Sequence, residues 1–220
     1  MSERRASNFQ RITIVGNGNS PTGRGWGQYI DDSDYVIRMW DCWWQKEDDY
    51  GKQYDAGVIS MSPTELIRVQ HWVKRSEFRQ PGVFLGKATH IISPTLFNKY
   101  ISPLMLIMDR DELTLRAKEL VQETGKLKLT RGCLAICQAI LSMRPNTIML
   151  VGFDNLREGV GTPNAPGNDA LWEPGEVAAT HSCDGKQKIN RHDCLAEQRL
   201  IAELAAEHSV TVFHAQDRLP

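Results

Sequence analysis

Short apolar runs alternate along the chain with longer segments in which apolar residues recur every three or four positions. The short runs, rich in valine and isoleucine, are typical of buried strands, and the longer spacing is typical of amphipathic helices. This alternation predicts an α/β domain with a mostly parallel sheet flanked by helices. The predicted strands are 11–15, 35–38, 57–60, 82–85, 89–92, 147–151 and 210–213, and the predicted helices are 63–76, 111–123, 132–143 and 192–207.

One long segment, 152–190, has no sustained apolar period and is rich in glycine, proline, asparagine and charge. A structureless loop of this length inside a compact domain is usually functional or disordered. We therefore expect residues 155–190 to act as a lid. The 220 residues suit one domain with a proper core. We expect a flexible N-terminus, 1–10, followed by a single domain over 11–220.

Composition narrows the classes of partner. The chain is 41% apolar and 24% charged, with a formal net charge of −1, which gives no reason to expect binding to nucleic acid or to an anionic membrane. No run approaches the roughly 18 apolar residues of a membrane span, and the N-terminus lacks the apolar region of a secretory signal. The odd number of scattered cysteines argues against a disulfide framework and suits a reducing compartment. A cytoplasmic protein is predicted.

The first strand runs directly into a glycine-rich loop, in the stretch ITIVGNGNSPTGRGWG. Gly16 and Gly18 allow a sharp turn and a close approach of the backbone to whatever lies above the strand's carboxyl end. In open α/β sheets this is where nucleotides and phosphates bind. The sixth position of the dinucleotide fingerprint is Pro21, and the Lys-Ser/Thr pair of a P-loop is missing. We interpret the loop as a nucleotide-binding loop that is neither a dinucleotide fingerprint nor a P-loop.

Two further segments offer polar groups at strand or helix ends. Thr130 can cap a helix that begins with Arg131 and Gly132, and a helix N-terminus suits an anion, although a simple capped core helix explains the same pattern. Asp154 follows a buried strand and emerges at the sheet's carboxyl edge. It is either a functional acid there or a cap for the next turn.

His181 and His192 are the candidate acid–base groups, because histidine titrates near neutral pH. Glu197 lies five residues beyond His192 and can hold the local backbone. An alternative is a zinc site, since His181-x-Cys183 and His192-x-Cys194 pair the ligand types that zinc prefers. Structural zinc sites, however, usually separate paired ligands by two to four residues rather than one.

Taken together, these groups resemble the motifs of sialyltransferases, in particular the bacterial and animal families that use CMP-activated sugars. The matching motifs, in the family's order, are G-N-G-x-S at 16–20, D-x-V-x-R at 34–38, (T/S)-x-G at 130–132, G-x-D at 152–154 and H-x-x-x-x-E at 192–197. The family pattern has an asparagine after Arg38, where this sequence has Met39-Trp40-Asp41.

The resemblance implies a GT-A-like domain that transfers sialic acid from CMP-sialic acid to a glycan acceptor with inversion, without a metal or other cofactor. It implies that His192 is the general base, that His181 donates to the departing phosphate and that Glu197 supports the site. The implied nucleotide-binding residues are Gly16, Asn17, Gly18, Asn19, Ser20, Arg38, Thr130, Arg131, Gly132 and Asp154.

Three alternatives stay open at this point. A CMP-Kdo-type transferase keeps the fold and changes the donor sugar. A cytidine-nucleotide-binding module without catalysis is motivated by the departure at Trp40 and by the short chain. A zinc site at His181, Cys183, His192 and Cys194 implies a zinc-dependent hydrolase.

Overall fold

A computed structural model of the chain describes residues 9–16, 18–39, 47–53, 55–59, 82–85, 105–106, 110–120, 129–154, 156 and 194–220. Seven strands form one sheet in the order β5-β4-β3-β2-β1-β6-β7, and every neighbouring pair is parallel. The strands are β1 (Arg11–Val15), β2 (Tyr35–Met39), β3 (Ala56–Ile59), β4 (Gly82–Leu85), β5 (Met105–Leu106), β6 (Thr147–Val151) and β7 (Thr211–His214).

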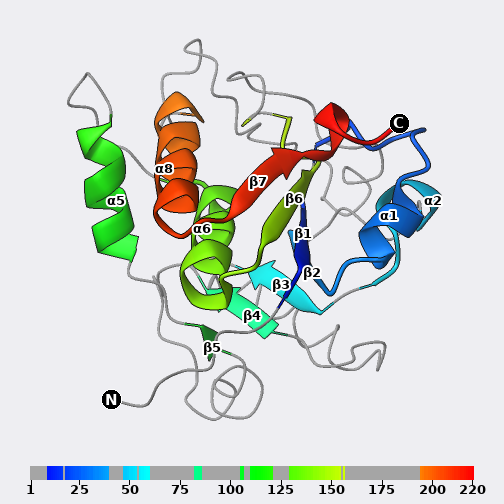
Figure 1. Cartoon of the computed structure of the whole chain (residues 1–220), viewed down its shortest axis with the longest axis horizontal. Coiled ribbons are helices and arrows are strands. Elements are labelled where there is room, and N and C mark those ends of the chain that lie inside the picture. The colour runs from blue at the N-terminus through cyan, green and yellow to red at the C-terminus, as the bar shows by residue number, and fades with distance from the viewer. Residues whose placement is uncertain are drawn as a thin grey trace, which may run out of the picture.

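The strand order reverses direction at β1. The chain steps outward from β1 to β5 on one side of the sheet and then returns to place β6 and β7 on the other side (Figure 1). Val15 pairs with Val151, so the carboxyl ends of β1 and β6 lie side by side. Open α/β sheets bind their ligands in the crevice at such a switch point, outside the carboxyl ends of the strands.

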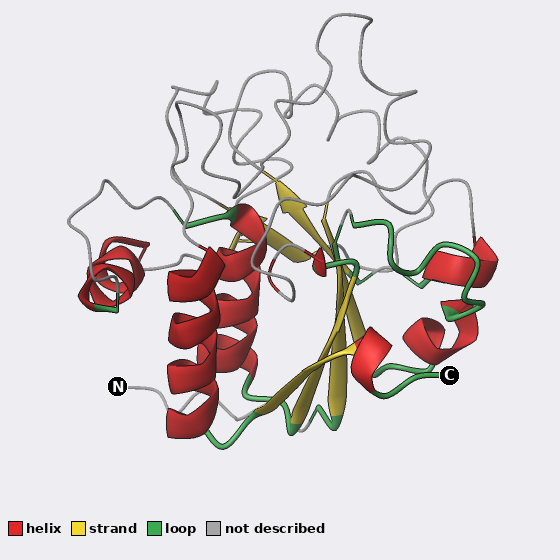
Figure 2. Cartoon of the chain, turned by 90° about the horizontal axis from the view of Figure 1, so that it is seen from above, coloured by secondary structure: helices red, strands yellow, loops and turns green. Residues whose placement is uncertain are grey.

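Helices cover both faces of the sheet (Figure 2). One face carries α5 (Arg110–Glu119), α6 (Arg131–Gln138) with the π-helical turn η3 (Ala139–Met143), and α8 (Cys194–Glu207). The other carries the short helices α1 (Gly27–Asp31) and α2 (Glu47–Tyr50), together with the 3₁₀ turn η5 (Ala215–Asp217).

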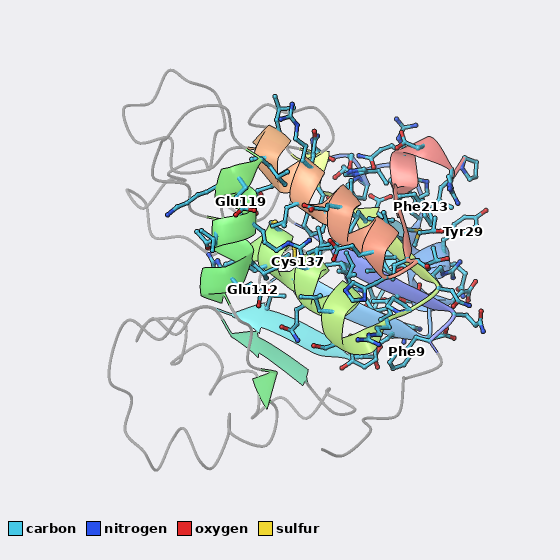
Figure 3. The ribbon with its side chains drawn as sticks, turned by 60° about the vertical axis from the view of Figure 1, so that its left-hand side comes forward. Phe9, Tyr29, Glu112, Glu119, Cys137 and Phe213 are labelled. Carbon is cyan, nitrogen blue, oxygen red and sulfur yellow. The ribbon has the colours of Figure 1, made fainter. Side chains whose placement is uncertain are left out.

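The two faces have separate cores because successive side chains of a strand point to opposite sides. Ile12 and Ile14 pack into the larger core with α6 and α8, whereas Val15 packs into the smaller one with Trp26. Figure 3 shows Cys137 on α6, where it is fully buried in the larger core. A central strand buried on both faces explains the continuous apolar run at the start of the sequence.

Most predicted elements are confirmed within one or two residues. The helix predicted over 192–207 is described from Cys194 onward, and the one predicted over 132–143 changes to π-helix at Ala139. The short elements α1, α2 and β5 were not predicted. The predicted strand 89–92 and helix 63–76 lie outside the described residues, as do residues 1–8 of the N-terminus and all of the lid except Leu156. Among the described helices, none has the length and apolar character needed to cross a membrane.

Candidate functional site

The loops that follow β1 and β6 continue to pair beyond the ends of the strands. The Gly16 amide donates to the Val151 carbonyl at 2.7 Å, and the Gly18 amide donates to the Gly152 carbonyl at 2.8 Å. A Cβ on Gly16 would lie 2.5 Å from the Gly152 oxygen, and one on Gly18 would lie 2.6 Å from Asp154 Oδ2. The close approach predicted at these glycines is therefore between two loops of the protein itself.

The start of α6 packs against the same corner. Phe153 follows β6 and is 4% exposed, and a Cβ on Gly132 would lie 2.6 Å from its Cε1 atom. Glycine at the second position of α6 thus brings the helix N-terminus close to the end of β6. The predicted nucleotide loop and the predicted anion-binding helix end are neighbours in space.

Asp154 links this corner to two distant segments. Its carboxylate, on a residue 6% exposed, accepts the Ser20 amide at Oδ2 and the Gln216 carboxamide at Oδ1, both at 2.9 Å. Asp154 emerges at the carboxyl edge of β6, where the sequence placed it. Both of its oxygens receive donors from the protein, so it organises the loop that contains Ser20.

Helix α2 holds the far half of the opening loop. Asp49 accepts the amides of Gly23 and Gly25 at 2.7 and 2.9 Å. The buried Tyr50 hydroxyl donates to the Gly18 carbonyl at 3.1 Å. The loop is therefore fastened from two sides, by Asp154 and by α2, which restricts its backbone before any ligand arrives.

Arg38 lies inside the protein rather than at its surface. Its residue is fully buried, Nε donates to the Gln53 carbonyl at 2.8 Å, and Nη1 donates to the Tyr50 carbonyl at 2.9 Å. These bonds fix the chain that follows α2, and through Tyr50 they steady the opening loop. The predicted direct contact between Arg38 and a nucleotide stays a prediction.

Thr130 caps α6 and is itself held by a buried carboxylate. The Thr130 hydroxyl accepts the Cys133 amide at 3.0 Å, as the capping prediction requires. Glu197, which is fully buried on α8, accepts the Thr130 amide at 2.5 Å and the Thr130 hydroxyl at 2.7 Å. The first turns of α6 and α8 are therefore fixed to each other.

The first turn of α6 offers backbone amides and the positive end of the helix dipole, together with the Arg131 side chain. Cys133 in this turn is not a nucleophile. Its hydrogen bond with Cys137 and its complete burial raise its pKa well above the usual value for a thiol. It stays protonated near neutral pH, so Cys133 adds no negative charge to this helix end.

Cys194, the first residue of α8, is disulfide-bonded, whereas Cys133 and Cys137 are free. The prediction of reduced cysteines is thus wrong for Cys194, and the cytoplasmic location stays a prediction. A disulfide sulfur is not the thiolate that binds zinc, so the zinc site proposed on four ligands including Cys194 is wrong as well.

Several predicted site residues are left without a structural test. Asn17, His181 and His192 lie outside the described residues. Asn19 is exposed in the opening loop, and Ser20 carries a buried hydroxyl. The sequence reasoning missed three loop-holding side chains: Asp49, Tyr50 and Gln216.

No family model matches the sequence, and no curated protein matches it either. Several solved structures do match the chain. The monofunctional alpha-2,3-sialyltransferase Cst-I from Campylobacter jejuni superposes with a TM-score of 0.59 at 17% identity, over 94% of this chain and 75% of that one. The apo alpha-2,3-sialyltransferase from C. jejuni gives 0.58 at 16% identity, over 99% and 80%.

A third match is the sialyltransferase CstII from C. jejuni in complex with cytidine-5′-monophosphate. Its TM-score is 0.56 at 15% identity, over 94% of this chain and 80% of that one. At these identities the likeness shows the fold. The chain has a sialyltransferase-like fold, and the predicted GT-A-like α/β architecture is confirmed.

Proposed function

We propose that the protein is a glycosyltransferase that moves sialic acid from CMP-sialic acid to a hydroxyl of a glycan. One observation carries the proposal: the opening loop, Asp154 and the N-terminus of α6 meet at the switch point of the sheet. This is the crevice in which α/β sheets bind nucleotides. A solved protein of the same fold contains CMP, and another structure of CstII contains CMP with a trisaccharide acceptor.

The donor nucleotide is proposed to lie between the opening loop and α6. Ser20 has a buried hydroxyl with no hydrogen-bond partner among the described residues, so it is available to a ligand. The first-turn amides of α6 and the Arg131 guanidinium suit the phosphate of CMP, because charged donors bind phosphate oxygens strongly. These donors meet the charge on the leaving CMP, so we propose that transfer needs no divalent ion.

The general base is proposed to be His192, which precedes Cys194 by two residues and Glu197 by five. Glu197 fixes the start of α8 to Thr130 at the cap of α6. Because His192 is only two residues from the start of α8, we propose that it reaches the anion-binding end of α6, where it would deprotonate an acceptor hydroxyl. One base opposite the departing CMP leads to inversion, and His181 is proposed to donate to that phosphate.

Titration calorimetry with CMP in EDTA, with UMP and NAD as controls, tests nucleotide binding. Micromolar binding of CMP alone supports the proposal, and a preference for NAD or UMP would contradict it. A donor panel read by CMP release then separates CMP-sialic acid from CMP-Kdo. Binding of CMP without turnover of any donor would favour the non-catalytic cytidine-binding module.

The base is tested by His192→Ala. We expect transfer to be abolished while CMP binding stays within about threefold of the wild type, because the base contacts the acceptor rather than the nucleotide. His208→Ala, at the far end of α8, is the matched control and should leave both unchanged. Wild-type transfer by the His192 variant would show that another group is the base.

A further inference from the structure

Gln216 is a polar residue of the Asp154 corner that lies outside all of the sequence motifs. It sits in η5, directly after β7, and donates from Nε2 to Asp154 Oδ1 at 2.9 Å across 62 residues of sequence. Because β6 and β7 are parallel neighbours, with Leu150 opposite His214, their carboxyl ends share one edge of the sheet. Gln216 is therefore held at the switch-point edge by the fold itself.

Asp154 holds Gln216 and Ser20 at the same time. Its second oxygen accepts the Ser20 amide at 2.9 Å. The Ser20 hydroxyl and the Gln216 carbonyl oxygen are both buried and have no hydrogen-bond partner within the described part of the chain. Burying a polar atom without a partner is costly, and folded proteins rarely retain such atoms without a function. Two such unpaired polar atoms lie on residues bound to the Asp154 carboxylate, which indicates that this corner contacts a ligand as well as joining two loops.

We propose that Gln216 is a positioning residue of the nucleotide pocket. By donating to Asp154 it fixes the carboxylate that accepts the Ser20 amide, and thereby places the Ser20 hydroxyl where a bound cytidine nucleotide meets it. The inference rests on the proposed function for the identity of the ligand. It predicts that a residue some 200 positions from the opening loop sets the affinity of that loop for CMP.

A reciprocal exchange of donor and acceptor tests the contact. Gln216→Glu removes the donor and sets two carboxylates together, and Gln216→Leu removes the donor together with the unpaired carbonyl oxygen without adding a charge. Each should weaken CMP binding roughly tenfold or more, the usual scale of a hydrogen bond to a charged group. Adding Asp154→Asn to Gln216→Glu supplies a new amide donor for the new carboxylate and still leaves an acceptor for Ser20. The double variant should recover affinity to within about threefold of the wild type.

A double-mutant cycle separates positioning from a general loss of stability. If Gln216 acts through Ser20, then Gln216→Leu should weaken CMP binding much less in a Ser20→Ala background than in the wild type. Gln28→Leu is the matched control, since Gln28 makes the same kind of bond, to Asp32 at 2.7 Å, on the exposed surface of α1. It should leave CMP affinity unchanged. Additive losses, or no recovery in the exchanged pair, would overturn the proposal.

Amide hydrogen exchange without ligand tests positioning independently of CMP. The Ser20 amide should exchange roughly tenfold faster in Gln216→Leu and at the wild-type rate in Gln28→Leu, since losing a local anchor increases local opening. Unchanged exchange at Ser20 would overturn the positioning role. If the Ser20 amide exchanges faster in Gln216→Leu but the wild-type protein does not bind CMP, the proposed function is overturned. Gln216 would then still be the residue that positions Ser20.

Discussion

Asp154 and Glu197 are two buried carboxylates of the candidate site, and they have different kinds of partner. Within the described part of the chain, both oxygens of Glu197 accept donors from Thr130, which joins the first turns of two helices. Asp154 divides its oxygens between Ser20 and Gln216 and joins two loop segments. Glu197 therefore joins two helices, and Asp154 joins two loop segments.

The difference indicates how the site combines rigidity with ligand contact. Glu197 is fully buried on the helix face that contributes Ala196 and Leu200 to the larger core. Asp154 is flanked by the buried hydroxyl of Ser20 and the buried carbonyl oxygen of Gln216, which have no hydrogen-bond partner among the described residues. We therefore expect Glu197 to control mainly the stability of the fold and Asp154 to control mainly the affinity for the nucleotide.

The largest effect is expected for Glu197→Ala. It leaves the Thr130 amide without its acceptor and opens a cavity in the core, which should lower the free energy of unfolding by about 3 kcal/mol. Chemical denaturation measures the loss. Glu203→Ala, exposed on the same helix, is the control and should cost about 0.5 kcal/mol or less. A loss below about 1 kcal/mol for Glu197→Ala would contradict its role as a brace.

Gly132 follows the cap residue Thr130 by two positions and packs against the Phe153 ring. Gly132→Ala places a Cβ 2.6 Å from the Phe153 ring. This overpacking should lower the free energy of unfolding by about 2 kcal/mol, which chemical denaturation would measure. Since the displaced ring lies next to Asp154, CMP affinity should fall as well. Gly23→Ala is a poor control because of its positive φ, whereas Ala202→Gly at an exposed site of α8 reports the ordinary cost of an Ala–Gly exchange. An unchanged free energy of unfolding in Gly132→Ala would show that Phe153 can move to accommodate the added Cβ and would contradict the prediction.

The parts of this arrangement that are local in sequence could be predicted. The apolar runs predicted the strands around the switch point, and Thr130 was predicted as a cap because a cap and its helix are adjacent. Asp154 was predicted at the carboxyl edge because it follows a buried strand closely. Each of these follows from neighbours within a few residues.

The anchors that act over long distances could not be predicted in this way. Tyr50 and Asp49 belong to the short polar stretch EDDY, which looks like solvated surface until the fold brings it against the opening loop. Gln216 meets Asp154 only because β7 lies beside β6. Arg38 likewise donates from a central strand to the carbonyls of Gln53 and Tyr50, which the fold brings beside it. Tertiary pairing decides such contacts.

A smaller loss of stability is expected for Asp154→Ala. Its partners are loop groups that water can reach once the loop relaxes, so the free energy of unfolding should fall by about 1 kcal/mol. CMP affinity should fall at least tenfold in the same variant, on the scale of a lost bond to a charged group. Calorimetry and denaturation on one sample measure both. A large loss of stability with unchanged CMP affinity would contradict this prediction, because Asp154 would then control the stability of the fold rather than nucleotide binding.

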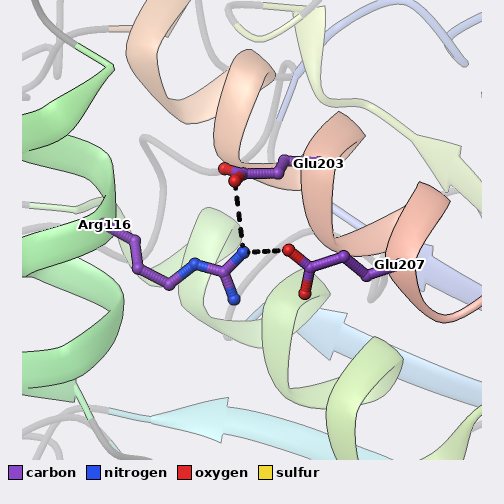
Figure 4. Close-up of polar contacts among 3 residues, drawn as sticks. All are labelled: Arg116, Glu203 and Glu207. Atoms are coloured by element: carbon purple, nitrogen blue, oxygen red, sulfur yellow. Dashed lines mark hydrogen bonds and ion pairs between the residues drawn. The ribbon is translucent and has the colours of Figure 1, made fainter.

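The smallest effect is expected at the surface, where a carboxylate pair is also bridged. Arg116 on α5 lies 2.5 Å from a Glu207 oxygen and 3.4 Å from a Glu203 oxygen on α8 (Figure 4). Water solvates all three charges when the bridge opens, so Arg116→Ala should cost only about 0.5 kcal/mol, and less in high salt. Denaturation at low and high salt measures this against Lys118→Ala, an exposed change on the same helix. A loss as large as that of Glu197→Ala would mean that the number of charged partners, rather than burial, determines what a carboxylate contributes in this protein.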